Sequence, residues 1–210
     1  MIFENLDFFR EGGVIMYPLL ACSIISVTFI VERAIFWIGY RLRGDRARLR
    51  EVLGTLRRRE TAAARDLIGT SRDPLLKVVQ LGIDNDQNAL RGNMEMAYAE
   101  EEKRFNRFMM VLDTIVTLAP LMGILGTVLG IIESFEILGS GLGRTDPLAV
   151  TSGIAKALIT TAAGLVIAIF TLIPYNFYRS RVDNSLAEVE EVATFLEVNL
   201  KGTGSAEGAS

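Results

Sequence analysis

Histidine is absent from this 210-residue chain, and cysteine occurs only once. Without histidine the chain lacks the most common general base, the usual neutral metal ligand and the central member of a Ser-His-Asp triad. The single Cys22 cannot form an intramolecular disulfide, and no phosphate-binding loop of the GxxxxGK[ST] type occurs. We therefore expect no enzyme, no bound metal and no organic cofactor.

Charge is also missing from long stretches of the chain. Half of the residues are apolar, 22% are charged, and the formal net charge of −3 argues against a nucleic-acid partner. Of the 22 Lys and Arg, 18 lie in two segments, 41–107 and 179–201. This uneven distribution indicates an integral membrane protein.

Three runs are long and apolar enough to cross a bilayer, whose hydrocarbon core of about 30 Å requires about 20 helical residues. The first is uncharged from Gly12 to Val31, the second extends from Thr114 to Ile132, and the third extends from Ala157 to Tyr178. The sequence contains no fourth run of this kind. It therefore predicts an all-α polytopic membrane protein with three transmembrane helices.

The distribution of Lys and Arg predicts the orientation, because these residues are enriched on the cytoplasmic side of membrane helices. The 18 clustered Lys and Arg follow the first and third runs, whereas the N-terminal flank carries Arg10 and the loop after the second run carries Arg144. The N-terminus is therefore expected outside and the C-terminus inside. The predicted segments are an extracytoplasmic flank (1–11), transmembrane helix 1 (12–40), a cytoplasmic helical segment (41–110), transmembrane helix 2 (111–137), a short extracytoplasmic loop (138–152), transmembrane helix 3 (153–178), a cytoplasmic amphipathic helix (179–201) and a disordered tail (202–210).

The cytoplasmic segment has helical periodicity. Asp73 before Pro74 is typical of a helix N-cap followed by proline in the first turn. From Asn88 to Ile137 only Pro120 would interrupt a helix, so we expect one continuous helix there, about 75 Å long at 1.5 Å per residue.

The C-terminal segment predicts an acidic amphipathic helix that packs on the basic helices of the cytoplasmic segment. Its apolar positions recur at spacings of four and three residues: Val182, Leu186, Val189, Ala193, Leu196 and Leu200.

Small residues form a stripe on each of the last two membrane helices. Such residues allow close helix approach in lipid. On the second helix they are Pro120, Gly123, Gly126, Thr127, Gly130 and Ser134; on the third they are Gly153, Ala157, Thr161, Gly164, Ala168 and Thr171, with Thr160 beside them. The stripes are either helix packing alone, with threonine hydroxyls bonded one turn back, or the lining of a narrow polar crevice.

Three stretches carry a resemblance to a known family: MYPLLACSIISVTFIVER (16–33), TLAPLMGILGTVLGIIESF (117–135) and GIAKALITTAAGLVIAIFTLIPYN (153–176). In order, spacing and topology they resemble the MotA/TolQ/ExbB proton channel family. MotA proteins have four spans, so this chain looks more like the ExbB/TolQ branch.

The resemblance implies a fold and a function. Five such subunits form a ring in the bacterial inner membrane around a pair of single-span ExbD/TolR-like helices, with the N-terminus periplasmic. Proton flow is converted into work on an envelope-spanning TonB/TolA-like protein, for transport or for envelope maintenance. Alternatives are a non-conducting scaffold that stabilises a single-span partner, or the stator of a motility machine.

The resemblance also assigns residues. The family's polar channel positions correspond to Thr127 and Thr161, with Thr160 beside them, and its proline corresponds to Pro120. We expect close helix packing at Pro120, Gly123, Gly126, Gly130 and Gly164.

One residue departs from the pattern, because Lys156 stands where ExbB and TolQ sequences typically have glutamate. Lys156 either reaches the outer surface or a partner, or else belongs to the proton path. Asp113 and Glu133 are further candidates for the pathway or for partner contacts. No Asp, Glu, Lys, Arg or His lies within 114–132 or 157–178, so a proton-carrying carboxylate has to come from another chain.

Overall fold

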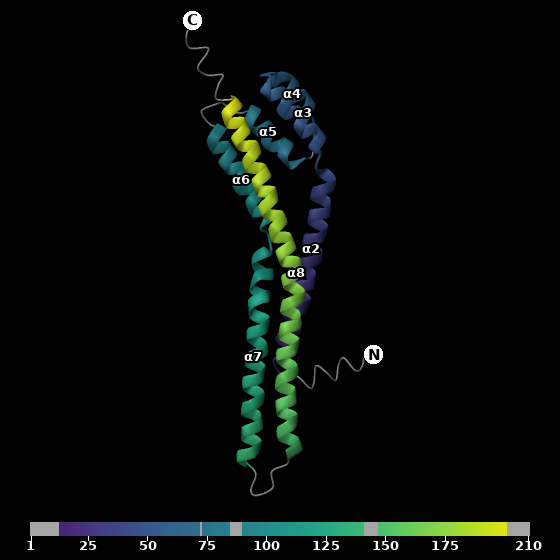
Figure 1. Ribbon diagram of the computed structural model, residues 1–210, viewed down its shortest axis with the longest axis vertical. Coiled ribbons are helices and arrows are strands. Elements are labelled where there is room, and N and C mark those ends of the chain that lie inside the picture. Colours follow the sequence, from purple (N-terminus) through teal and green to yellow (C-terminus); the bar gives the residue numbers. More distant parts are fainter. Residues whose placement is uncertain (1–12, 72, 85–89, 141–146, 201–210) are drawn as a thin grey trace. The chain divides into compact units, whose positions relative to one another are not determined.

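The computed structural model describes residues 13–71, 73–84, 90–140 and 147–200 (Figure 1). Within these ranges all regular structure is helical and no strand occurs, which confirms the predicted fold class. The predicted flank 1–11, the tail 202–210 and residues 141–146 of the predicted loop lie outside the described residues. The helices are α2 (Met16–Arg43), α3 (Arg46–Arg57), α4 (Thr61–Ile68), α5 (Pro74–Asp84), α6 (Leu90–Phe105), α7 (Met109–Ser140) and α8 (Pro147–Leu200).

Three of the described helices, α2, α7 and α8, are long and apolar enough to cross a membrane, which confirms the three predicted spans. The contacts within the chain divide it into two units. We call Met1–Arg33 together with Phe108–Tyr178 the spanning unit, and Ala34–Arg107 together with Arg179–Ser210 the head unit.

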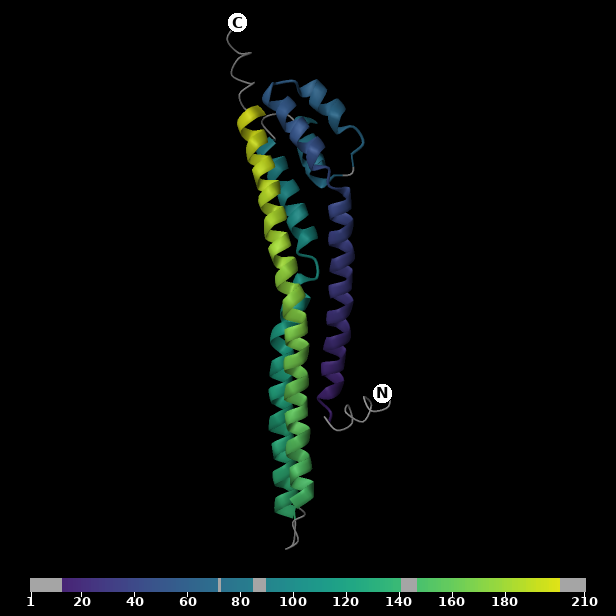
Figure 2. The same ribbon diagram turned by 45° about the vertical axis from the view of Figure 1, so that its right-hand side comes forward.

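The spanning unit has small and apolar residues inside and large apolar residues outside. Met16 and Leu19 of α2 are buried with Ala119 of α7. On the outer surface Phe135 is 67% and Phe170 73% exposed. Apolar exposure of this extent is expected where lipid rather than water surrounds the helices. In Figures 1 and 2, α7 and α8 run side by side through this unit.

The predicted single helix from Asn88 to Ile137 is interrupted, since α6 ends at Phe105 and α7 begins at Met109. Phe108 adopts a left-handed backbone conformation with φ of 63°, which costs a bulky residue about 1–3 kcal/mol. Its ring stacks on Phe29 of α2 with centroids 4.4 Å apart, and the Arg33 guanidinium lies 5.8 Å from its centroid. These tertiary contacts offset the backbone strain and end the helix where local sequence favours continuing it.

The head unit is held together by an apolar core to which α8 contributes one face. Val189, Val192 and Leu196 of α8 are buried with Val52 and Leu56 of α3 and with residues of α4, α5 and α6. Arg46 of α3 also bonds the Glu188 carboxylate. The predicted packing of the acidic C-terminal helix on the basic helices is therefore confirmed.

Two linked caps begin α3 and α5. Asp45 accepts a hydrogen bond from the Arg48 amide at 3.0 Å. Asp73, 2% exposed, accepts from the Leu75 amide at 2.8 Å through one oxygen and from the Asp45 amide at 2.6 Å through the other. The predicted Asp73 cap is confirmed, and the same carboxylate ties the start of α5 to the start of α3.

We expect Asp73→Ala to destabilise the head unit by about 2 kcal/mol, because one cap is lost and a second amide loses its partner. Thermal unfolding followed by circular dichroism in detergent measures the change. Asp66→Ala is the matched control, since Asp66 is exposed on α4. Equal unfolding temperatures for the two variants would contradict the role given to Asp73.

Candidate functional site

The contact between α7 and α8 is built on glycines. A Cβ at Gly123 would lie 3.0 Å from the Thr161 Cα, and a Cβ at Gly126 would lie 2.5 Å from the Thr160 Cγ2. A Cβ at Gly130 would lie 2.7 Å from the Ala157 Cβ. The distances at Gly126 and Gly130 are shorter than real Cβ contacts and the distance at Gly123 is at the tight end of their range, so the missing side chains allow the two helices to approach this closely.

Glycines of α8 serve the same contact from the other side. A Cβ at Gly164 would overlap the Ala119 carbonyl oxygen, and a Cβ at Gly153 would overlap the Ser134 hydroxyl. Ala119 is itself fully buried. Five glycines, three on α7 and two on α8, therefore place the backbones of the helices in direct contact.

The two neighbouring threonines of α8 have different places in this contact. Thr160 is 1% exposed, and its hydroxyl donates to the Lys156 carbonyl at 2.8 Å. Thr161 is half-buried, and its hydroxyl donates across the contact to the Gly123 carbonyl at 2.8 Å. The sequence pattern placed Thr161 on the stripe and Thr160 beside it, whereas the structure places Thr160 at the centre and Thr161 at the edge.

Thr127 lies at the corresponding edge of α7. It is half-buried, and its hydroxyl donates to the Ile124 carbonyl of its own helix at 2.6 Å. Among the described residues no hydrogen bond joins Thr127 directly to Thr161. Both hydroxyls use their hydrogen on a backbone carbonyl, which leaves their oxygen lone pairs as acceptors.

The α7–α8 contact has one side covered by α2. Met16 and Leu19 of α2 pack against Met122, Ala163 and Ile167. On α7 the contact runs along Gly123, Gly126 and Gly130, and at about 100° per residue Met122 and Thr127 lie on opposite sides of it. On α8 it runs along Ala157, Thr160 and Gly164, and Ala163 and Thr161 lie on opposite sides of it. Thr127 and Thr161 are therefore on the side that α2 leaves uncovered.

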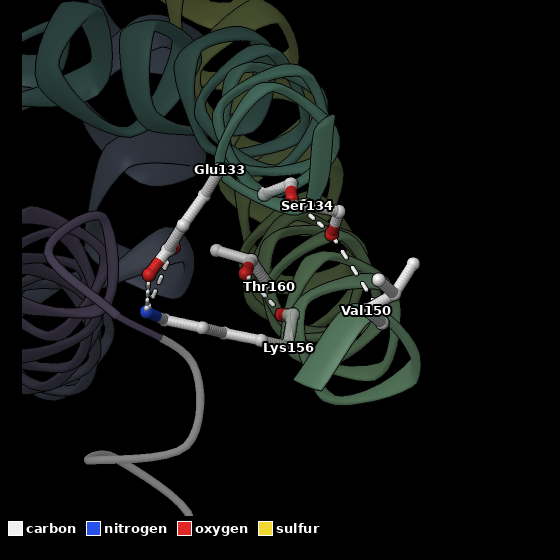
Figure 3. A network of polar contacts seen from close by, with 6 residues as sticks. Glu133, Ser134, Val150, Lys156 and Thr160 are labelled. Atoms are coloured by element: carbon white, nitrogen blue, oxygen red, sulfur yellow. Dashed lines mark hydrogen bonds and ion pairs between the residues drawn. The ribbon is translucent and has the colours of Figure 1, made fainter. Parts of the chain in front are cut away.

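Lys156 and Glu133 lie on the α2 side near one end of the contact. The Lys156 ammonium bonds both Glu133 carboxylate oxygens, at 3.1 and 3.4 Å (Figure 3). Their side chains are 32% and 53% exposed. The Lys156 stem lies against Gly13, where a Cβ would be 2.5 Å from Cε.

The remaining predicted residues lie apart from this pair. Asp113 is exposed in the second turn of α7, and among the described residues it makes no contact with Thr127 or Thr161. Pro120 is half-buried within α7. The glycine contact therefore brings together Thr127, Thr160 and Thr161. Lys156 and Glu133 form an ion pair on its α2 side, and Asp113 belongs to neither group.

Sequence reasoning missed the polar contacts between α2 and α8. Ser26 and Thr171, 3% and 1% exposed, share a hydrogen bond of 2.6 Å between their hydroxyls. The Tyr178 hydroxyl donates to the Ile30 carbonyl at 3.0 Å. The available signal was the group of hydroxyl residues Ser23, Ser26 and Thr28 in an apolar run, since a hydroxyl in lipid requires a partner.

Arg33 is the most deeply buried charge of the spanning unit, with 1% exposure. Its guanidinium forms two hydrogen bonds with the Glu32 carboxylate, of 2.6 and 2.8 Å. Two parallel bonds of this kind are stronger than neutral hydrogen bonds and offset part of the cost of burying the Arg33 charge. No cluster of three or more His, Cys, Asp or Glu that could hold a metal occurs in residues 13–71, 73–84, 90–140 and 147–200.

Comparison with known proteins places these features in a family context. The profile of the MotA/TolQ/ExbB proton channel family matches residues 70–191. A Synechocystis protein named biopolymer transport protein ExbB-like 1 is 36% identical over 92% of this chain and 78% of its own length. A second Synechocystis protein, ExbB-like 3, is 32% identical over 89% of this chain and 90% of its own length. Biopolymer transport protein exbB1 of Vibrio cholerae is 27% identical over 92% of this chain and 87% of its own length.

We expect Gly164→Ala to destabilise the spanning unit by about 1–3 kcal/mol, because the new methyl meets the Ala119 backbone, which cannot move aside as a side chain can. Gly139→Ala on α7 is the control, since a Cβ there meets nothing within 4 Å. Thermal melting and size-exclusion chromatography in detergent measure the effect. If Gly164→Ala melts with the control, the close contact described above is wrong.

Proposed function

Since the chain belongs to the MotA/TolQ/ExbB proton channel family, we propose that it is the ring subunit of a motor driven by the proton-motive force in the bacterial inner membrane. It conducts protons together with an ExbD/TolR-like single-span partner. The energy passes to an envelope-spanning TonB/TolA-like protein, for transport or for envelope work. The N-terminus lies in the periplasm and the C-terminus in the cytoplasm.

The observation that carries the proposal is the position of Thr127 and Thr161. Both hydroxyls lie at the edge of the α7–α8 contact that α2 leaves uncovered. Their oxygen lone pairs can accept hydrogen bonds from a neighbouring group while each hydroxyl still donates to its backbone carbonyl. A second chain in the membrane that approached this edge would meet two polar positions on an otherwise apolar surface.

The proton itself requires a group that titrates, and the central parts of α7 and α8 contain none. Residues 114–132 and 157–178 include no Asp, Glu, Lys, Arg or His. A threonine hydroxyl passes a hydrogen bond but neither takes up an extra proton nor releases its own at neutral pH. A carboxylate on a partner helix is therefore the proton carrier, and the threonine edge is the surface along which it works.

The same surface supports assembly into a ring. Large apolar side chains flank the threonines, and Ile131 and Leu165 are 45% and 47% exposed. Further copies of the chain, the partner helices and lipid cover these side chains. The chain has no histidine, the most common general base, which fits a transducer rather than an enzyme.

One observation favours the alternative of a non-conducting scaffold. Thr127 and Thr161 each donate to a backbone carbonyl, as threonines do when they serve helix packing alone. A scaffold would tolerate alanine at both positions, because each substitution removes only one hydroxyl and leaves the helix packing almost unchanged. The two functions therefore differ in what the hydroxyls contribute to proton flux.

We expect Thr127→Ala and Thr161→Ala to assemble normally and to lower proton flux about 2- to 10-fold each, the rate equivalent of losing one hydrogen bond of about 0.5–1.5 kcal/mol. Valine at either position should lower flux further. Flux is measured in liposomes containing the ring and its partner. Thr28→Ala is the control, because that exposed hydroxyl bonds only within α2. Unchanged flux in the double alanine variant would support the scaffold instead.

We expect the purified chain to form a homopentamer, held by small-residue contacts between membrane helices and by apolar helix surfaces outside them. Native mass spectrometry of the detergent-solubilised protein gives the subunit number directly. A stable monomer would contradict the ring.

A further inference from the structure

Near Lys156, polar contacts link α7 to α8 on both sides of their contact. On the α2 flank the Lys156 ammonium bonds the Glu133 carboxylate at 3.1 and 3.4 Å. On the opposite flank the Ser134 hydroxyl, buried, lies 2.8 Å from the Gly130 carbonyl and 3.4 Å from the Val150 carbonyl of α8 (Figure 3). The ion pair is the stronger of these two links because both partners carry a full charge.

The ion pair is connected to the threonines through α8. The Lys156 carbonyl accepts the hydroxyl of Thr160, one turn further along, and Thr160 fills the space against Gly126. Thr161 follows directly and bonds the Gly123 carbonyl. An axial shift of α8 against α7 at Lys156 would therefore be transmitted to the bond between Thr161 and Gly123.

The charges themselves point away from the threonine edge. At about 100° per residue, Lys156 lies about 140° around α8 from Thr161. Ala163, which packs with α2, lies about 160° from Thr161, so both residues are on the α2 side. Its stem lies against Gly13, a residue with φ of 74° that has no side chain to collide with the lysine. The ion pair and the threonines therefore occupy opposite flanks of one helix contact.

From this geometry, and resting on the proposed function, we propose that Lys156 and Glu133 are positioning residues. Their ion pair clamps α7 to α8, with Gly13 against the Lys156 stem, and sets the register that holds Thr161 on Gly123 beside Thr127. The lysine that replaces the family's usual glutamate is neutralised within its own subunit. It is not part of the proton line.

If the Lys156–Glu133 ion pair clamps α7 to α8, single variants should weaken this contact and a charge-swapped double variant should restore it. Lys156→Gln and Glu133→Gln each leave one charge without its partner. The charge-swapped variant Lys156→Glu/Glu133→Lys restores an ion pair with the signs exchanged. Glu136→Gln is the matched control, because Glu136 is exposed one turn further along α7 and forms no ion pair in the described part of the chain.

The first readout is independent of proton flux. Each single variant should lower the melting temperature of the detergent-solubilised ring by about 2–4 °C, and the swapped variant should recover most of it. The Glu136→Gln control should melt as the wild type does. Single variants that melt as the wild type does would overturn the clamp, even if the wild-type ring conducts no protons and the proposed function itself fails.

The second readout separates positioning from a direct role in proton transfer. Flux in liposomes with the partner is measured against external pH. Each single variant should lower maximal flux about 3- to 10-fold through misplaced hydroxyls, leave the midpoint pH unchanged, and be rescued by the swap. A midpoint that moves in Lys156→Gln but not in Glu133→Gln would overturn the proposal, because the ammonium would then act on the proton carrier directly. A swapped variant that melts normally but stays slow would overturn it too.

Discussion

The carbonyl oxygen of Ala119 occupies the place where a side chain on Gly164 would have to be, and the backbones of α7 and α8 touch there. In lipid no hydrophobic effect drives two apolar helices together, so contact of this closeness is their main source of association. The glycines at the contact bring Thr160 against Gly126 and Thr161 within hydrogen-bond distance of the Gly123 carbonyl. The polar positions of the spanning unit depend on that approach.

The same contact separates two kinds of surface. On one flank α2 packs over Met122 and Ala163, and the charges of Lys156 and Glu133 neutralise each other there. On the other flank Thr127 and Thr161 remain at an uncovered edge. In the proposed function this edge guides a proton only together with another chain, because no Asp, Glu, Lys, Arg or His lies between Thr114 and Ile132.

Periodicity and helix caps allowed much of this architecture to be predicted. The three spans, the Asp73 cap and the packing face of the C-terminal helix follow from local pattern, and the structure contains all of them. The end of α6 at Phe105 could not be predicted, because it depends on the ring of Phe108 stacking on Phe29, which is distant in sequence. The site shows the same limit: its small residues were predictable, but the exchange of places between Thr160 and Thr161 depends on how far α8 is rotated against α7. For Lys156 the sequence left a surface position and the proton path open, and only the structure pairs it with Glu133.

In the proposed function this chain guides protons, and a carboxylate of a partner chain carries them. The most direct test compares proton flux, under an imposed pH gradient, in liposomes containing the purified ring alone and in liposomes containing the ring with a single-span partner that has one membrane aspartate. We expect background flux for the ring alone, conduction with the partner, and loss of conduction when that aspartate is replaced by asparagine. Equal flux with and without the partner would contradict this division of roles.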